Sequence, residues 1–392
     1  DDMTPRFRAV IFDLDGTLAD TLQDIAGCAN ECAALCGAAP VPAERFRFFV
    51  GDGLAVLAER LLGTTDRTRI EAFSAAFTAR LPAWQMKSSH LYPGVRELLA
   101  ALEARGVQAA VLTNKPHALA ELLLAGIAAD IRFAAVAGQI AGRPRKPDPA
   151  GIFAICRRLG VPPSSILYAG DSAVDMETGR RAGAAAAGVL WGFRGARELV
   201  EAGAHYLAAR PADLLACLDG VPPLPLLATE RLVLRPALAG DLAAFQEFWS
   251  DAEANRIDHG TSDAGAWHAR SVERLKRLLR KRPSRTIWTV LLPPALTIVG
   301  YVRLRRYCFL TARGTLAIRL GRPWWNRGYA TETLRAWCPY IAAQRRLKVL
   351  DLSVLASNTA AMRVYAKAGF TLVETRPRRG GNWCTLEWHV PS

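Results

Sequence analysis

The chain has 392 residues, of which 51% are hydrophobic and 22% are charged, and this length allows two or three domains with separate cores. No stretch approaches the roughly 18 consecutive apolar residues of a membrane-spanning helix. We find no secretion signal, and the eight cysteines show no close pairing. A cytoplasmic protein with reduced thiols and no membrane partner is therefore expected.

The positive charge is concentrated in the second half of the chain. Up to Ala228 there are 23 Lys and Arg against 24 Asp and Glu, whereas from Thr229 onward there are 27 against 12. Such asymmetry predicts two domains with different partners. The basic half is expected to bind an anionic partner, which could be a nucleic acid, a membrane surface or a polyphosphate cofactor, although nothing beyond this charge supports a membrane role.

The first 218 residues alternate short apolar runs with helical patterns. The runs at 9–12, 108–112 and 166–169 have the length of buried parallel strands, and a polar turn and a helical segment follow each of them. This alternation is typical of a doubly wound, Rossmann-like α/β domain. Residues 18–90 interrupt it with an almost wholly helical pattern, which predicts an inserted cap.

A Gly- and Pro-rich segment at 219–228 is interpreted as a linker, which gives domains at 1–218 and 229–392. The second domain is predicted to be a mixed α/β fold. Its predicted elements are a strand at 231–235, helices at 237–251 and 266–281, strands at 286–292, 297–304 and 315–320, a helix from 329, a strand at 349–355, a helix from 359 and a final strand pair.

Polar side chains follow each of the three strands predicted in the first half. Because the carboxyl ends of parallel strands meet at one edge of a sheet, these side chains should converge. Clustered carboxylates require a cation such as Mg²⁺, and a carboxylate beside Mg²⁺ can attack phosphorus to form an aspartyl-phosphate. Helix capping could explain one such cluster but not three. The candidate residues are Asp13, Asp15, Thr113, Asn114, Asp171 and Asp175, with Lys146 from a separate loop.

The segments DLDGTL, LTNK, KPD and GDSAVDM resemble, in this order, the four motifs of the haloacid dehalogenase superfamily of phosphatases. The resemblance implies that Asp13 is the nucleophile and that Asp15 is the general acid and base. It further implies a metal site and a phosphoryl site. The metal would be held by Asp13, the backbone carbonyl of Asp15, Asp171 and Asp175. The phosphoryl group would be held by Gly16, Thr113, Asn114 and Lys146, and Lys146 would also balance charge.

The helical insertion resembles the small cap of phosphoglycolate phosphatases, on the segments FVGDGL at 49–54, LYPGV at 91–95 and GVLWG at 188–192. The same pattern also resembles phosphatases that act on sugar phosphates, including amino-sugar acids of cell-wall recycling. The implied substrate is a small phosphate monoester, either phosphoglycolate or a sugar phosphate.

The second half resembles the GNAT superfamily of N-acetyltransferases, especially the ribosomal-protein type, in the segments TERLVLRP, RPWWNRGYATE and NTAAMRVYAKAGF. In that family the backbone amides of the turn before a helix bind the pyrophosphate of acetyl-CoA. The implied role of Tyr365 is to protonate the departing coenzyme A thiolate. The implied cofactor-binding residues are Leu320, Arg322, Asn326, Arg327, Gly328, Tyr329, Ala330 and Asn358.

Two positions depart from the GNAT pattern. Asn326 stands where the phosphate-binding turn usually has its first glycine, but asparagine tolerates a left-handed backbone. Thr315 stands where many ribosomal-type enzymes have the glutamate that activates the amine, so the base could be a water chain, another acid or the substrate itself. The alternative to an active acetyltransferase is a non-catalytic domain that binds acetyl-CoA or acts as a scaffold.

A run of basic residues lies on the helix predicted at 266–281 and just beyond it. It could face RNA or a phosphorylated metabolite, or it could be a solvated surface. No nucleic-acid-binding motif accompanies the run, so a nucleic-acid partner is not expected. The run comprises Arg270, Arg274, Lys276, Arg277, Arg280, Lys281, Arg282 and Arg285.

The sequence therefore predicts a bifunctional enzyme. Its two sites could act on one phosphorylated amine or on two separate substrates. In the second case the acetyl acceptor would be an amine of a small molecule or a protein N-terminus.

Overall fold

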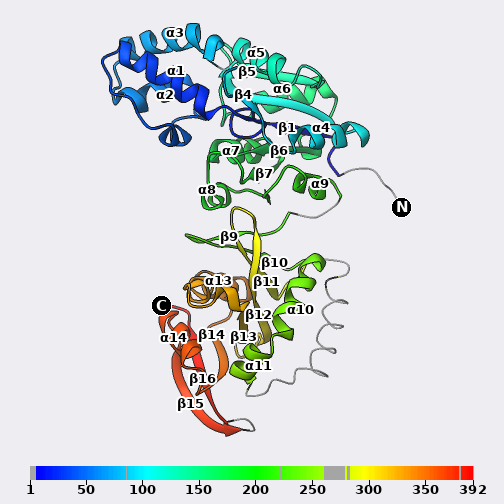
Figure 1. Cartoon of the computed structure of the whole chain (residues 1–392). Helices are drawn as coiled ribbons and strands as arrows, with labels where there is room; N and C mark the ends of the chain where they lie inside the picture. Colours follow the sequence, from blue (N-terminus) through cyan, green and yellow to red (C-terminus); the bar gives the residue numbers. More distant parts are fainter. Residues whose placement is uncertain are drawn as a thin grey trace. The chain divides into compact units, whose positions relative to one another are not determined.

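The computed structural model describes residues 6–84, 86–219, 223–259, 279, 283–378 and 381–391. The chain divides into two compact units, Asp1–Pro223 and Leu224–Ser392 (Figure 1). Each helix among the described residues is too short or too polar to cross a membrane.

The first unit is built on a six-stranded parallel sheet in the order β5-β4-β1-β6-β7-β8, which confirms the doubly wound α/β fold. Both faces of this sheet are covered, because Val10 and Phe12 of β1 belong to one buried cluster and Ala9 and Ile11 belong to another. The strands are β1 (Ala9–Phe12), β4 (Gln108–Pro116), β5 (Ala135–Gln139), β6 (Ile166–Gly170), β7 (Ala185–Val189) and β8 (Tyr206–Ala208).

Helices alternate with these strands along the chain. They are α4 (Val95–Ala104), α5 (His117–Ile127), α6 (Ala150–Leu159), α7 (Ala173–Ala182), α8 (Ala196–Glu201) and α9 (Asp213–Leu218). The register decides where the site forms. Phe12, the last residue of β1, pairs with Val111 of β4 and with Ala169 of β6. The residues that follow these three positions therefore reach the same edge of the sheet.

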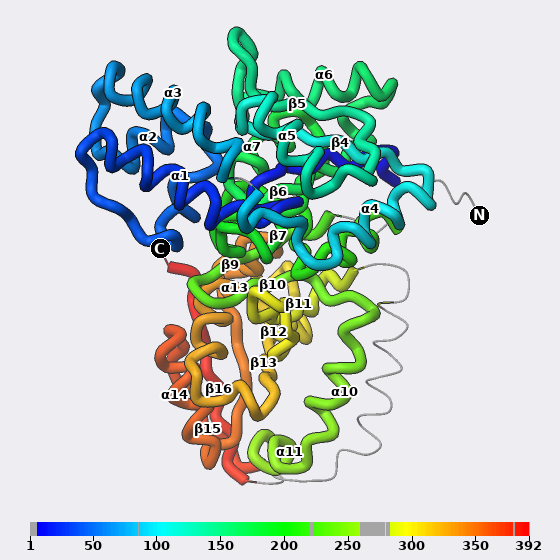
Figure 2. The backbone as a smooth tube through the Cα atoms, turned by 45° about the horizontal axis from the view of Figure 1, so that its top comes forward, coloured from blue at the N-terminus to red at the C-terminus, as the bar shows by residue number. Residues whose placement is uncertain are grey.

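The cap contains α1 (Leu22–Leu35), α2 (Leu54–Leu62) and α3 (Arg67–Trp84), together with a 3₁₀ helix at Ala43–Phe48. These helices enclose their own buried cluster, which includes Phe46, Phe73 and Phe77, and they gather at one side of the unit (Figure 2). The cap is predicted as almost wholly helical over about 18–90, and its two connections to the core are short strands. β2 (Ala19–Asp20) pairs antiparallel with β3 (His90–Leu91), and strands of two residues leave no periodicity in a sequence.

The second unit contains an eight-stranded mixed sheet in the order β15-β16-β14-β13-β12-β11-β10-β9. The parallel pair β13 and β14 is joined only over Arg313–Thr315 and Val349–Asp351, and beyond these residues the two strands separate. The strands are β9 (Leu227–Ala228), β10 (Val233–Pro236), β11 (Ile287–Leu292), β12 (Thr297–Cys308), β13 (Arg313–Leu320), β14 (Val349–Leu355), β15 (Thr371–Arg378) and β16 (Gly381–His389).

Helices cover both faces of this sheet. α13 (Tyr329–Arg345) and α14 (Thr359–Lys367) pack on one face, where Trp337 is fully buried. α10 (Leu242–Ser250) packs on the other face, where Phe245 and Trp249 contact a separate buried cluster (Figure 2). The alternation of Tyr301 and Val302 between the two clusters explains why β12 is apolar on both sides.

Two predictions for the second half need correction, and a third falls outside the described residues. The predicted linker ends early, because Leu227–Ala228 forms β9 against β10. The helix predicted over 237–251 is instead a 3₁₀ turn at Ala239–Asp241 followed by α10. A second helix, α11 (Ala252–His259), begins after Asp251, which has an extended backbone. The Asp251 side chain accepts a hydrogen bond from the backbone N–H of Ala254 in the first turn of α11. The helix predicted over 266–281 lies outside the described residues except for residue 279, as does the basic run except for Arg285.

Candidate active sites

The acidic residues predicted at the strand ends of the first unit come together. Asp13 follows β1, whereas Asp171 follows β6 and Asp175 lies in the first turn of α7. Each offers a carboxylate oxygen, and these oxygens lie within 4.8 Å of one another. All three side chains are buried. Like charges held this close repel one another unless positive charge lies among them.

Part of that positive charge comes from Lys146. Its Nζ lies 2.8 Å from Oδ1 of Asp13 and 2.7 Å from Oδ1 of Asp175. The contact with Asp13 is a close ion pair, and Oδ1 of Asp13 is a buried atom with no other hydrogen-bond partner among the described residues. Burial, opposed by the Lys146 charge, raises the pKa of Asp13 to about 7. Burial and the Asp175 charge raise the pKa of Asp171 well above its usual range.

The cluster has the properties of a site for a divalent cation. Three buried carboxylates face one ammonium group, and every candidate ligand is an oxygen atom, as Mg²⁺ prefers. The acceptor-only Oδ1 of Asp13 fits a metal ligand. The Asp15 carboxylate is outside this cluster, so the predicted contribution of Asp15 through its backbone carbonyl stays a prediction.

The Asp15 side chain has partners of its own. Lys115 places Nζ 3.0 Å from Oδ1 of Asp15, and the Thr21 hydroxyl donates a 2.7 Å hydrogen bond to the same oxygen. Lys115 and Asp15 are both buried, so this ion pair fixes the carboxylate in one position. No role was predicted for Lys115, although a lysine directly after Thr113 and Asn114 at a strand end was the available signal.

Asn114 joins three parts of the first unit. Its Nδ2 donates to the carbonyl oxygen of Gly51 in the cap, at 3.0 Å, and to that of Lys146, at 3.2 Å. Its Oδ1 accepts from the backbone N–H of Lys146 at 2.9 Å. Both amide hydrogens are thus used within the protein, and the predicted phosphoryl contact of Asn114 stays a prediction. The predicted role of Thr113 stays a prediction; its hydroxyl accepts a hydrogen bond from the backbone N–H of Lys115.

Core and cap together enclose a small cavity of about 50 Å³ beside Asp13 and Asp15. The wall contributed by the cap is largely apolar, and the wall contributed by the core carries the charged groups. A substrate in this cavity would place a compact charged end against the core. The lining residues from the cap are Ile25, Val50, Gly51, Gly53, Leu54, Leu57, Phe77 and Leu81.

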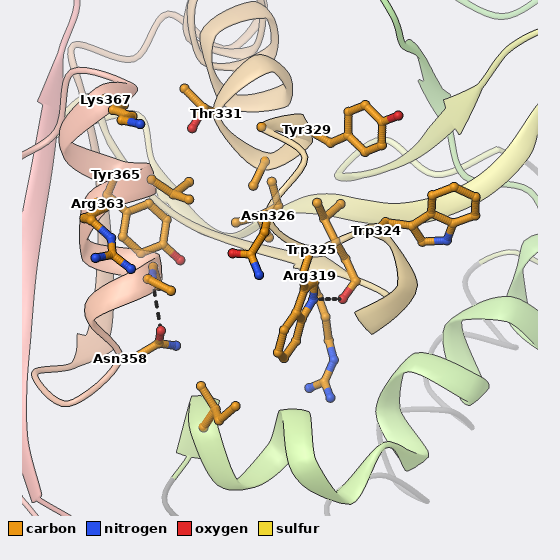
Figure 3. Close-up of a pocket in the computed structure, with 18 of the residues that line it drawn as sticks. Arg319, Trp324, Trp325, Asn326, Tyr329, Thr331, Asn358, Arg363, Tyr365 and Lys367 are labelled. Carbon is orange, nitrogen blue, oxygen red and sulfur yellow. Dashed lines mark hydrogen bonds between the residues drawn. The ribbon is translucent and has the colours of Figure 1, made fainter.

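A larger cavity, of about 380 Å³, lies in the second unit where β13 and β14 separate. It is lined by residues of α11, β13, the turn before α13, the first turn of α13, and α14 (Figure 3). Asn326 from the turn and Tyr365 from α14 point into it from opposite sides (Figure 3).

The turn before α13 has the backbone of an anion-binding loop. Asn326 has φ 58° and Gly328 has φ 81°, and α13 begins at the next residue. The predicted left-handed conformation of Asn326 is therefore observed. The opening strand segment braces this turn, because Arg231 donates to the carbonyl oxygen of Arg327 at 2.9 Å and pairs with Glu332 in the first turn of α13.

Most of the predicted cofactor-binding residues line this cavity, but two arginines do not. Arg322 pairs with Asp251, and the Arg327 guanidinium lies over the Trp324 ring, 5.4 Å from its centroid. Neither arginine is among the residues that line the cavity. The predicted residues that line the cavity are Leu320, Asn326, Gly328, Tyr329, Ala330, Asn358 and Tyr365.

Residues 10–189 match the family model described as haloacid dehalogenase-like hydrolase. A phosphoglycolate phosphatase of Pseudomonas fluorescens is 33% identical over 199 residues, which cover 50% of this chain and 73% of that protein. An N-acetylmuramic acid 6-phosphate phosphatase of Pseudomonas aeruginosa is 32% identical over 216 residues, which cover 55% of this chain and 96% of that protein. The chain belongs to the haloacid dehalogenase-like hydrolases.

The remaining comparisons concern the fold of this hydrolase unit and the second unit. The crystal structure of a predicted phosphoglycolate phosphatase from Haemophilus somnus aligns with a TM-score of 0.50 at 28% identity, covering 54% of this chain and 97% of that chain. Residues 231–371 match the family model described as acetyltransferase (GNAT) domain. The haloacid dehalogenase-like hydrolase is thus followed by a GNAT acetyltransferase domain, and both families are enzymes.

Asp258 and Arg319 line the cavity of the GNAT domain but were not singled out from the sequence. Asp258 lies near the end of α11, and Arg319 is a buried residue of β13. The position expected for a base, Thr315, does not line the cavity; its hydroxyl donates to Asp351 instead. A single aspartate on a short helix carries no motif, so the sequence held no signal for Asp258.

Gly16, in the first motif of the hydrolase, has a backbone conformation that residues with a side chain adopt only with strain. Its φ is 86°, and a Cβ atom there would lie 2.3 Å from Oδ2 of Asp171. We expect Gly16→Ala to lower phosphate release by about 10²-fold, because Asp171 must move, and to destabilise the fold by roughly 1–3 kcal/mol. Enzyme assays and urea unfolding would measure the two effects.

Gly160→Ala is the matched control for this substitution. Gly160 has φ 67° and ends α6, but a Cβ there meets nothing within 4 Å. The Gly160→Ala variant should lose about 1 kcal/mol of folding stability and keep its phosphate-releasing activity. Equal activity in the two variants would contradict the steric argument.

Proposed function

We propose that this chain is a bifunctional enzyme. Its first unit is a Mg²⁺-dependent phosphatase that hydrolyses a small phosphate monoester through an aspartyl-phosphate, and its second unit is an acetyl-CoA-dependent N-acetyltransferase. The observation that carries the phosphatase proposal is the buried group of three carboxylates around Lys146, with Asp15 held separately beside it. The eight free cysteines suit the reducing environment of the cytoplasm.

In the proposed reaction Asp13 attacks the phosphorus atom, and the bond from phosphorus to the ester oxygen breaks. Asp15 gives a proton to the departing alkoxide and then, as a carboxylate, takes a proton from the water that releases phosphate. Lys115 and Thr21 keep the Asp15 carboxylate in place for both steps. Lys146 offsets the charge of Asp13 and Asp175. Exclusion of bulk water by the cap protects the acyl phosphate.

Asp13, Asp171 and Asp175 are the side chains that would hold or support Mg²⁺. The ion, when bound, supplies positive charge that neutralises phosphate oxygens. Chelation with EDTA is therefore expected to abolish phosphate release, and added Mg²⁺ should restore it. Ca²⁺, with its longer bonds and six to eight ligands, should not restore it. A Mg²⁺-dependent rise in the melting temperature would report binding independently of activity. Full activity after chelation would refute the metal dependence.

The substrate class follows from the size of the site and from the relatives. The cavity of about 50 Å³ supports a small ester such as phosphoglycolate, and one relative is named for that substrate. Another relative is named for N-acetylmuramic acid 6-phosphate. Phosphate release from a panel containing both esters and amino-sugar phosphates, with Asp13→Asn as the blank, would distinguish them. Preference for the larger ester would refute the size argument.

For the second unit, the proposal rests on the position of Tyr365 opposite the left-handed turn before α13. The turn and the start of α13 would bind the pyrophosphate of acetyl-CoA, and Tyr365 would protonate the departing thiolate. Burial, followed by the Asp258 charge, raises the pKa of Tyr365 well above its usual range, so it carries its proton at neutral pH.

The second candidate function for this unit is binding of acetyl-CoA without transfer, which the threonine at position 315 favours. Turnover of acetyl-CoA with amine panels would distinguish the two. Testing each phosphate ester with and without acetyl-CoA also asks whether the sites share a substrate. If acetylation of an amino-bearing ester changes its rate of hydrolysis, one pathway uses both sites; if phosphoglycolate is hydrolysed regardless of acetyl-CoA, the sites are independent.

A further inference from the structure

The GNAT domain has no carboxylate at position 315, but a carboxylate from another element lines its cavity. Asp258 of α11 is a lining residue, as is Tyr365 of α14, so one acid and one hydroxyl share a cavity of about 380 Å³. Two elements far apart in the sequence thus supply the two proton-transfer groups that acyl transfer to an amine requires.

Asp258 is held in place from two directions. Asn358, which caps α14 by accepting from the backbone N–H of Ala361, also donates from Nδ2 to Oδ1 of Asp258 at 3.3 Å. Arg319 of β13 has Nη1 3.7 Å from Oδ2 of Asp258, and its Nη2 is fixed by a 2.8 Å hydrogen bond to Asn255. An amide and a guanidinium therefore orient the carboxylate, one on each oxygen.

We propose that Asp258 is the general base that removes the proton from the acceptor amine, in place of the carboxylate missing at Thr315. This inference rests on the proposed acetyl-transfer activity. In the step, the amine nitrogen bonds to the thioester carbonyl carbon, and the bond from that carbon to sulfur breaks. The nitrogen gives one proton to Asp258, and the sulfur takes one from Tyr365. A free amine and acetyl-CoA thus become an amide and coenzyme A, and both side chains exchange protons with solvent afterwards.

The surroundings of Asp258 agree with this role. Burial, which outweighs the Arg319 charge and the Asn358 hydrogen bond, raises the pKa of Asp258 and so makes it a stronger base than an exposed aspartate. The described groups that face it are Arg319 from β13 and Asn358 and Tyr365 from the α14 segment. Arg363 and Lys367 of α14 also line the cavity.

The test compares Asp258→Asn with the wild type, using acetyl-CoA as donor and two probes, a peptide with a free α-amino group and glucosamine 6-phosphate. We expect kcat at pH 7 to fall by about 10²–10³-fold, with the Kd for acetyl-CoA changed less than threefold. The wild-type rate should fall in acid as Asp258 becomes protonated, and the variant should lack this titration while both enzymes still depend on the uncharged amine. Asp258→Glu, which restores a carboxylate, should recover part of the activity.

Glu253→Gln is the matched control, since Glu253 lies on α11 but faces solvent and pairs with Arg256. It should behave as the wild type does. A wild-type kcat and pH profile in Asp258→Asn would overturn the assignment while leaving the acetyltransferase proposal intact. A parallel loss of acetyl-CoA binding would also overturn it, in favour of a structural role. If the wild type acetylates neither probe although it binds acetyl-CoA, both proposals fail for these acceptors.

Discussion

Asp13→Asn is expected to lower phosphate release by roughly 10⁴-fold or more, because it removes the attacking carboxylate while keeping its shape. Oδ1 of Asp13 is buried and lies 2.8 Å from the Lys146 ammonium, which holds the carboxylate within the acidic cluster. An amide there cannot form an acyl phosphate. Single-turnover assays with phosphoglycolate would measure the loss, and mass spectrometry would show no phosphorylated enzyme.

Asp148→Asn provides the comparison for the Asp13 variant. Asp148 follows Lys146 closely in the chain, but its carboxylate caps α6 by accepting from the backbone N–H of Ala150, a bond that asparagine can also accept. This variant should retain its phosphatase activity. Should Asp13→Asn keep more than a tenth of the wild-type rate, the covalent mechanism would be untenable. Acetyl transfer should be unchanged in both variants.

Tyr365→Phe is expected to lower acetyl transfer by about 10²–10³-fold, because the departing thiolate then has no proton donor. Since burial and the Asp258 charge raise the pKa of Tyr365, its hydroxyl stays protonated throughout an assay range of roughly pH 6–9. The wild-type rate should therefore show no alkaline decline caused by this group. Stopped-flow measurement of thiol release, combined with calorimetry for acetyl-CoA affinity, would separate chemistry from binding.

Tyr340→Phe is the control for this substitution. Tyr340 belongs to α13 but packs its ring 5.0 Å from that of Trp288, and it does not line the cavity. Loss of the Tyr340 hydroxyl should leave acetyl transfer unaffected. A Tyr365→Phe enzyme with an unchanged rate would mean that solvent protonates the thiolate, and the assignment of Tyr365 would be withdrawn.

The parts of the first site that the sequence predicts are those fixed by local pattern. Asp13 directly follows an apolar run with the length of a buried strand, and Asp171 follows a second such run, so parallel pairing of the two strands brings them together. The ion pair between Lys115 and Asp15 spans 100 residues and depends on how two strand ends are rotated, which no local pattern records. The second task of Asn114, binding the cap through Gly51, was hidden for the same reason.

In the second site, too, local motifs predict some of the residues and not others. Tyr365, Asn358 and the turn at Asn326 lie in continuous motifs, and they line one cavity. Asp258 reaches that cavity only because α10 ends at Ser250 and α11 begins in a new direction after Asp251. The predicted helices ended at residue 251 and began again at 266, so the prediction contained no helix at the position of α11. Tertiary packing, rather than periodicity, therefore decides where this carboxylate lies.

The ribbon formed by β2 and β3 joins the cap to the segment that carries Asp15, the proposed proton donor. Ala19 pairs with Leu91 across the two connections of the cap, and on its other side it bridges to Asp15, whose carboxylate also accepts from Thr21. The cap connection and Asp15 are thus neighbours on one short stretch of chain. Any rotation of the cap about this connection would reach Asp15 within a few residues, so that access to the site and the position of the proposed acid would change together.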